Sequence, residues 1–184
     1  MKYIYLFGKN INEGDSAKID LLGGKGANLA EMSSLNIPVP PGFTVTTEVC
    51  NIFLKNYTLK KSIKRDILKA LQSVEKNISK KFGDIENPLL LSVRSGAKVS
   101  MPGMMETVLN IGLTSKTIPG LIKKTGNSRF VYDSYRRLMM MYADVVMDKA
   151  EQNNDINIRE KLEDILDRYK KKRSIINDYD LTTE

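Results

Sequence analysis

The 184-residue sequence predicts an α+β fold, in which an α/β-like first region is followed by an all-helical subdomain. Two observations lead to this prediction. Short apolar runs bounded by glycine or proline, which are typical of strands, occur before Gly112 and stop there. After Gly112, apolar residues recur with helical spacing up to the end of the sequence. We therefore expect an α/β subdomain at residues 1–112 and a helical subdomain at residues 113–184.

The first region alternates strands and helices. Its first helix is opened by a glycine cluster, and its strand at residues 42–46 follows closely spaced prolines. A long helix is predicted because seven apolar residues fall on one stripe of 3.6-residue period: Ile63, Ile67, Leu68, Leu71, Val74, Ile78 and Phe82. The expected elements are strands at 3–7, 42–46, 89–93 and 107–111, and helices at 25–34, from 47 onward, and at 60–82.

The second region is expected to be helical, with long helices at residues 128–147 and 157–172. Apolar residues nearly encircle the first of these helices, which predicts that it packs inside the subdomain. Either Arg136 or Arg137 is then available to bridge toward the α/β part. The acids of the last helix alternate with cations and predict a solvated face with i,i+4 pairs rather than a metal site: Glu160, Glu163, Asp164 and Asp167.

The composition excludes several kinds of chemistry. The chain has no histidine, so it cannot build a Ser-His-Asp or Cys-His catalytic system, and any phosphohistidine must belong to another domain or chain. Its single cysteine, Cys50, cannot form an internal disulfide or the usual His/Cys zinc site. No apolar run approaches the roughly 18 to 20 residues of a membrane span, and no export signal is evident. We therefore expect a cytoplasmic protein with no membrane partner.

The net charge of +7 is weak evidence about partners. Lysines outnumber arginines 21 to 8, a preference that is typical of genes rich in A and T, so the positive charge can reflect codon usage rather than an anionic partner. The basic stretch at residues 60–81 has no aromatic side chains between its ends that could stack on bases. A solvated helix face is therefore the preferred interpretation, and we expect no nucleic-acid partner.

A first candidate binding segment lies at residues 21–32. Glycines directly before a helix let backbone amides turn toward an anion, and the helix N-terminus adds a partial positive charge. Lys25 would complete such a phosphate site. The segment is neither a Walker A loop nor a dinucleotide fingerprint, because Gly26 follows the lysine and Leu29 stands where the third glycine would be. The alternative is a glycine turn with an exposed lysine.

A second candidate segment lies at residues 90–107. Arg94 ends a strand that looks buried, from which its planar guanidinium could be aimed at a phosphate. The loop after it offers backbone amides and hydroxyls that could cradle an anion. These come from Ser95, Gly96, Ser100 and Gly103. The alternative is a long hairpin whose methionines fill the edge of the core.

Together these segments resemble the N-terminal nucleotide-binding domain of the pyruvate, phosphate dikinase family. A related group, the phosphoenolpyruvate synthases, has a loop of Arg-Ser-Ser-Ala type rich in acidic residues at the second segment, which this chain lacks. The segments that carry the resemblance lie at residues 22–32, 41–48, 81–84, 92–105, 124–127, 132–137 and 141–147.

The resemblance implies the N-terminal half of an ATP-grasp domain. Such a domain passes the β-phosphoryl group of ATP to a histidine on a separate swivelling domain, which carries it to pyruvate. The resemblance further implies Mg²⁺ bound with ATP, with its ligands and the carrier histidine outside this chain, and a full-length homo-oligomer. It places no catalytic residue in the chain, and it assigns the binding of ATP phosphates to Lys25, Arg94, Ser95, Gly96, Gly103 and Met104.

Three expectations follow from this resemblance and from the residues themselves. Lys25 and Arg94 should converge on one phosphate-sized site, the loop at residues 95–105 should be mobile, and the chain should not turn over by itself. Two other functions stay open. The chain could be an anion-binding module without catalysis, or a folded piece that needs a second polypeptide.

Overall fold

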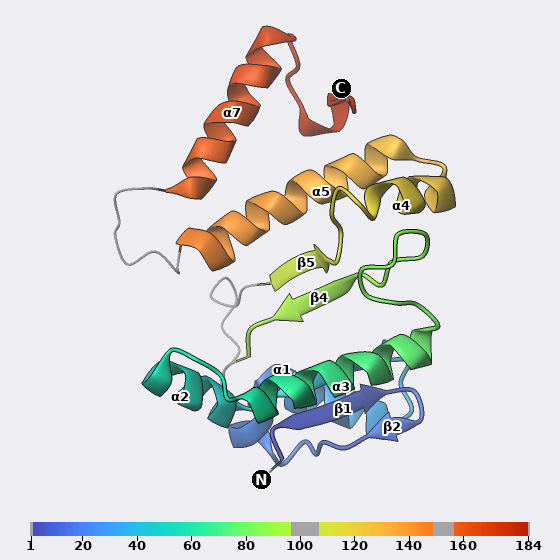
Figure 1. Cartoon of the computed structure of the whole chain (residues 1–184), viewed down its shortest axis with the longest axis vertical. Helices are drawn as coiled ribbons and strands as arrows, with labels where there is room; N and C mark the ends of the chain where they lie inside the picture. Colours follow the sequence, from blue (N-terminus) through green and yellow to red (C-terminus); the bar gives the residue numbers. More distant parts are fainter. Residues whose placement is uncertain (1, 97–106, 149–156, 184) are drawn as a thin grey trace. The chain divides into compact units, whose positions relative to one another are not determined.

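The computed structural model describes residues 2–96, 107–148 and 157–183. These residues form two compact units (Figure 1). The first unit contains the residues up to Lys80 together with Ser95 and Gly96. The second unit contains Lys81–Arg94 and the described residues from Thr107 onward. The mixture of helices and small sheets confirms the predicted α+β class at this coarse level.

The first unit is built on a three-stranded antiparallel sheet in the order β2-β1-β3. The central strand β1 pairs with β3 from Ile4 opposite Val45 to Phe7 opposite Gly42. Helices α1 and α3 pack on this sheet, and α2 packs on α1. The bounds of these elements are β1 Ile4–Gly8, β2 Ile11–Asn12, α1 Ile19–Ser34, β3 Gly42–Val45, α2 Thr47–Asn56 and α3 Lys61–Ile78.

Helix α3 follows the predicted stripe with two differences. The predicted helix is confirmed, and Ile63 and Val74 of the stripe are buried together with Ala70. Leu68 belongs to the same stripe but is 58% exposed. The helix also ends at Ile78 rather than at residue 82, because Ser79 takes a left-handed conformation with φ 55° that closes the last turn.

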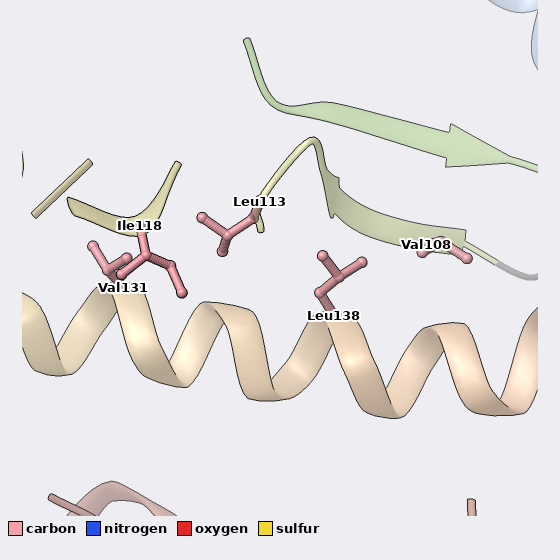
Figure 2. Packing of buried hydrophobic residues seen from close by; sticks show 5 residues of the cluster. All are labelled: Val108, Leu113, Ile118, Val131 and Leu138. Carbon is pink, nitrogen blue, oxygen red and sulfur yellow. The ribbon is translucent and has the colours of Figure 1, made fainter. Parts of the chain in front are cut away.

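The second unit places a two-stranded antiparallel sheet beside helices α4 and α5 (Figure 1). Figure 2 shows its core, in which side chains from α5 meet side chains from β5, from Leu113 and from the first residue of α4, Ile118. The core residues are Val108, Leu113, Ile118, Val131 and Leu138. The bounds are β4 Leu91–Arg94, β5 Thr107–Ile111, α4 Ile118–Thr125, α5 Ser128–Tyr142, the π-helical η1 Ala143–Met147, α7 Ile158–Lys172 and the 3₁₀ turn η2 Asp178–Asp180.

The units do not follow the subdomains expected from the sequence. The boundary at Gly112 places β4 and β5 in the first region, whereas both strands belong to the second unit. The physical reason is the core, because Val108 of β5 is buried among side chains of the helical part. Apolar alternation predicts that a strand exists, but it does not predict which helices cover it.

Helix α4 lies very close to the loop before β4, which contains Ile85 and Glu86. A Cβ added at Gly120 would lie 1.9 Å from the carbonyl oxygen of Ile85 and 2.8 Å from Cα of Glu86. These contacts are with backbone atoms, which cannot swing aside as the tip of a side chain can. The absence of a side chain at Gly120 is therefore required for α4 to pack here.

An ionic cluster joins α5, α7 and η2. The Nη2 atom of Arg136 lies 2.9 Å from Oδ1 of Asp133 and 3.1 Å from Oδ2 of Asp178. Nζ of Lys170 lies 2.8 Å from Oδ1 of the same Asp178, and Nε of Arg137 lies 2.8 Å from Asp133. Both arginines thus pair with acids of the helical part. The expectation that Arg136 or Arg137 bridges toward the α/β part stays a prediction.

The cluster predicts that acid destabilises the second unit. Hydrogen bonding to Lys170 holds the pKa of Asp178 below its ordinary value. Burial raises the pKa of Asp133, but its hydrogen bonds to Arg136 and Arg137 outweigh burial, so the pKa is lowered overall. A carboxyl group with a lowered pKa in the folded state stabilises the fold above its unfolded pKa of about 3.9, and that stabilisation is lost as the pH falls through the folded pKa.

We therefore expect the free energy of unfolding to fall below about pH 4. Asp178→Asn should lower it at pH 7 by roughly 1 kcal/mol or less, because the Asp178 side chain is 42% exposed and screened by solvent. The same variant should flatten the acid dependence, which urea titrations between pH 3 and pH 7 would measure. Asp164→Asn changes an exposed acid of α7 outside the cluster and serves as the control. An unchanged pH profile in Asp178→Asn would contradict the expectation.

Among the described residues, no helix is both long enough and apolar enough to cross a membrane.

Candidate phosphate-binding site

The start of α1 has the geometry of an anion-binding turn. Gly23 interrupts the helix with φ 70° and ψ 164°, a conformation that favours glycine. A short helical stretch from Ile19 precedes this kink, and a continuous helix runs from Gly24 onward. The glycine cluster therefore opens a helix as predicted, although the sequence did not predict the helical stretch before it. First-turn N–H groups of a helix generally lack intrahelical acceptors, and here they come from Gly24, Lys25 and Gly26.

Several contacts hold α1 against the sheet. Ser33 Oγ accepts a hydrogen bond from the backbone N–H of Gly8 at 3.2 Å and donates one to the carbonyl of Leu29 at 2.8 Å. A Cβ at Gly14 would lie 2.7 Å from Cβ of Ala30, so the segment after β2 touches the helix directly. The C-terminal half of α1 is thus held against the first unit's sheet and the segment after β2.

The lysine and the glycines differ in their exposure. Gly23 and Gly26 are buried, whereas the side chain of Lys25 is half-buried. Thr47, the first residue of α2, donates a 2.7 Å hydrogen bond from its hydroxyl to the carbonyl of Asp20 in the helical stretch before Gly23. The glycines therefore form the packed base of the turn, and Lys25 is the cationic side chain at the start of the main helix.

The second candidate segment comes close to the first at one described point. A Cβ added at Gly96 would lie 4.0 Å from the carbonyl oxygen of Leu22, the residue directly before the Gly23 kink. Ser95 and Gly96 are exposed and belong to the same compact unit as Lys25. The structure thus brings the start of the second glycine segment to the turn that precedes Lys25.

Arg94 belongs to the second unit, where it ends β4 and pairs with Thr107. The strand before it is only partly buried, because Leu89 is 3% exposed but Val93 is 53% exposed. The expectation of a strand buried up to its end is therefore wrong. The convergence of Lys25 and Arg94 stays a prediction.

Two of the predicted binding residues, Gly103 and Met104, lie outside the described residues. The predicted mobility of the loop at residues 95–105 concerns the same segment, of which only Ser95 and Gly96 are described. Both expectations stay predictions.

The acids of α7 form ion pairs on an exposed face. Nε of Arg159 lies 2.8 Å from Oε1 of Glu163 one turn later, and its Nη1 lies 2.9 Å from Oδ2 of Asp144. The prediction of a solvated face with i,i+4 pairs is confirmed at Glu163, with Arg159 as the partner. Within the described ranges, no three His, Cys, Asp or Glu side chains gather in a group that could hold a metal ion.

A cavity of about 230 Å³ lies in the second unit between α5, α7 and the residues after η2. Its two lining arginines are engaged within the protein. Arg129 donates hydrogen bonds to the carbonyls of Tyr179 and Leu181, and Arg136 is held in the ionic cluster. Mostly apolar walls without a free cation do not suit a phosphate, so the start of α1 is the better candidate site.

The fold and this helix start define an α+β protein with a candidate anion site at a glycine-kinked helix N-terminus. Comparison with protein families is consistent with that class. The family described as "Pyruvate phosphate dikinase, AMP/ATP-binding domain" matches residues 19–150, which include both glycine segments. The chain therefore belongs to this family, and the resemblance seen in its sequence motifs is confirmed.

Similar proteins match this chain along most or all of its length. The pyruvate, phosphate dikinase of Clostridium symbiosum is 46% identical over 184 residues, which are 100% of this chain and 20% of that protein. The chloroplastic pyruvate, phosphate dikinase 1 of Oryza sativa subsp. japonica is 48% identical over 98% of this chain and 18% of its own length. The Rickettsia conorii dikinase is 44% identical over 100% of this chain and 20% of its own length. The chain thus spans about a fifth of these relatives.

Proposed function

We propose that this chain is the first ATP-binding part of a pyruvate, phosphate dikinase, folded as the N-terminal half of an ATP-grasp domain. In this proposal the phosphates of ATP contact Lys25, Arg94, Ser95, Gly96, Gly103 and Met104. The family match across both glycine segments supports the proposal. The observation that carries it is the approach of Gly96 to the carbonyl of Leu22, which joins the two segments at the start of α1.

Each proposed group would act on the phosphates in a different way. The first-turn amides of α1 and the partial positive charge of the helix N-terminus favour an anion before any side chain is added. The ammonium of Lys25 supplies a point charge with three donors. The guanidinium of Arg94 supplies two parallel donors that match two oxygens of one phosphate group. Their combined effect is to hold a triphosphate in one position.

The complete reaction would convert ATP, phosphate and pyruvate to AMP, diphosphate and phosphoenolpyruvate. The acceptor histidine must belong to another part of such an enzyme, since this chain contains none. The remaining domains of the dikinase are therefore the proposed partners, in a cytoplasmic enzyme that forms homo-oligomers. Mg²⁺ bound with ATP would neutralise charge on the phosphates. The described residues offer no ligand cluster that fits this ion, so we assign no metal ligand here.

A second candidate function, anion binding without catalysis, rests on the exposed face of α3. This face carries five cations, and Nε of Arg65 lies 3.8 Å from Oδ1 of Asp66. Such a face attracts any polyanion through charge and would not distinguish ATP from polyphosphate. Its cations are Lys61, Lys64, Arg65, Lys69 and Lys76.

Titration of the chain with MgATP and with polyphosphate, followed by amide chemical shifts, tests the proposal. We expect ATP to bind in the millimolar range, where about −4 kcal/mol of binding free energy is available, and to bind more weakly as salt is added. Lys25→Met should weaken ATP binding about tenfold, since it removes a charge-assisted donor. Lys9→Met removes a cation from an exposed turn of the same unit and should leave binding unchanged.

Arg94 provides a second arm of this test. Arg94→Lys should bind ATP as poorly as Arg94→Met, because a point charge does not replace a bidentate fork. Equal affinity for ATP and polyphosphate, together with no effect of Lys25→Met, would favour the non-catalytic function instead.

A further inference from the structure

Gly26 lies directly on the side chain of Thr44. A Cβ added at Gly26 would be 2.7 Å from Cγ2 and 3.0 Å from Oγ1 of Thr44, and 3.2 Å from Cβ of Leu22. Real Cβ atoms essentially never come within 3.0 Å of another heavy atom. The backbone of α1 therefore approaches β3 as closely as a glycine allows, at the residue that follows Lys25.

Thr44 cannot move aside easily. It is β-branched, which restricts its χ1 angle, and it lies in the middle of β3 opposite Tyr5 of β1. The Tyr5 ring is itself covered by two cations, with Nζ of Lys2 at 5.0 Å and Nζ of Lys18 at 5.8 Å from its centroid. A side chain held in a paired strand is a rigid support for the helix above it.

The position of this contact along α1 matters more than its strength. The far end of the helix is held separately, through Ser33 and through the contact of Ala30 with Gly14. At the near end, Thr44 touches the helix within the turn formed by Gly24, Lys25 and Gly26. The height of α1 above β3 at Gly26 thus sets the position of the Lys25 backbone and the direction of the neighbouring amides.

We infer that Thr44 is a positioning residue of the phosphate site. Together with Gly26, it fixes the position of the N-terminal turn of α1 so that the backbone amides of this turn and the Lys25 side chain can bind the same phosphate group. This inference rests on the proposed function. Thr44 does not itself touch the phosphate. It acts through the helix, and a shift of a few tenths of an ångström to 1 Å at this turn is enough to misplace several donors together.

A double-mutant cycle tests the inference. Gly26→Ala adds a methyl group that must push α1 away from β3, and we expect ATP to bind about tenfold more weakly. Thr44→Ala removes the methyl and hydroxyl groups and should weaken binding about twofold. The double variant Gly26→Ala/Thr44→Ala puts one methyl group back at the contact, so its affinity should return to about that of Thr44→Ala. This recovery is non-additive, as expected for two side chains in contact.

The measurements are ATP dissociation constants from amide shift titrations at low salt, made at a temperature where every variant is folded. Gly42→Ala is the matched control, because the three heavy atoms nearest to its Cβ would all belong to the ring of Phe7 in the same sheet, with Cζ at 2.6 Å. It should lower the melting temperature and leave ATP affinity unchanged. The comparison of Gly42→Ala with Gly26→Ala distinguishes a positioning role of the Gly26–Thr44 contact from a general loss of stability.

The outcomes distinguish the inference from the proposal on which it rests. If the unchanged protein binds ATP but Gly26→Ala binds it equally well, or the double variant does not recover, the positioning role of Thr44 is overturned alone. If Gly42→Ala weakens binding as much as Gly26→Ala, the effect is one of stability and the inference is also overturned. If ATP causes no amide chemical-shift changes at Gly24, Lys25 or Gly26 of the unchanged protein, the proposed function is refuted, and the positioning role of Thr44 is refuted with it.

Discussion

Gly120→Ala is expected to destabilise the protein by about 3 kcal/mol or more, at the upper end of the cost of overpacking. The added Cβ would lie 1.9 Å from the carbonyl oxygen of Ile85 and 2.8 Å from Cα of Glu86. Neither backbone atom can rotate away, so α4 must move as a whole. That movement would pull Ile118 out of the core, where it is 4% exposed and packs with Val131. Urea denaturation followed by circular dichroism would measure the loss.

Gly126→Ala is the control for this prediction. Gly126 ends α4 with φ 66°, and a Cβ there would have no heavy atom within 4 Å. Its cost should therefore be limited to backbone strain, roughly 1 kcal/mol. A Gly120→Ala variant that is no less stable than Gly126→Ala would show that α4 can yield at little cost, contrary to the prediction.

Local sequence patterns predicted most of the elements but few of their ends. The strand at residues 107–111 and the start of a helix at Ser128 agree with the structure, because each has a clear boundary residue beside it. The end of α3 was missed because the left-handed Ser79 carries no glycine or proline signal. The two-residue strand β2 is too short to show any periodicity.

Contacts between distant residues were beyond local patterns. Arg136 pairs with Asp178, and no spacing rule connects a helix with a turn so far along the chain. The need for glycine at residue 120 was likewise invisible, since it depends on where the loop at Ile85 lies. The exposure of Val93 depends on which face of β4 is covered, which alternation alone does not decide.

The candidate site was predicted in part. The glycines before Lys25 indicated a helix start, and the structure has one there. The support given by Thr44 was not predicted, because its only sequence signal is a glycine inside the helix, which indicates a close approach without naming the neighbour. The approach of Gly96 to Leu22 is a tertiary contact of the same kind.

By itself, the chain is expected to form no AMP from MgATP, phosphate and pyruvate. Phosphoryl transfer needs an acceptor in line with the transferred group and metal ions that bridge the phosphates. The chain has no histidine to accept a phosphoryl group, and its described residues hold no metal-ligand cluster. Phosphate contacts without these groups can bind ATP but cannot transfer its phosphoryl group. We expect a rate at least about 10⁴-fold below a typical turnover of roughly 10 s⁻¹.

Separation of nucleotides by ion-exchange chromatography would measure AMP directly. The full-length dikinase of Clostridium symbiosum, 46% identical to this chain where the two align, is the positive control. A second sample would add the part of that enzyme that follows the aligned region. AMP formation only in this second sample would support the proposed function, whereas sustained AMP formation by the chain alone would refute the prediction.

The two compact units interleave along the chain, and this has a consequence for recombination with related genes. The chain leaves the first unit after Lys80, returns to it at Ser95 and Gly96, and is again in the second unit by Thr107. In a chimaera joined after Lys80, Leu22 and Gly96 come from different parents although they lie close together. In a chimaera joined after Gly96, the paired strands β4 and β5 come from different parents. No single crossover leaves both units with all of their own residues. Exchanging either unit intact therefore requires three joints, after Lys80, after Arg94 and between Gly96 and Thr107. A chimaera with one joint instead places sequences from both parents inside one unit.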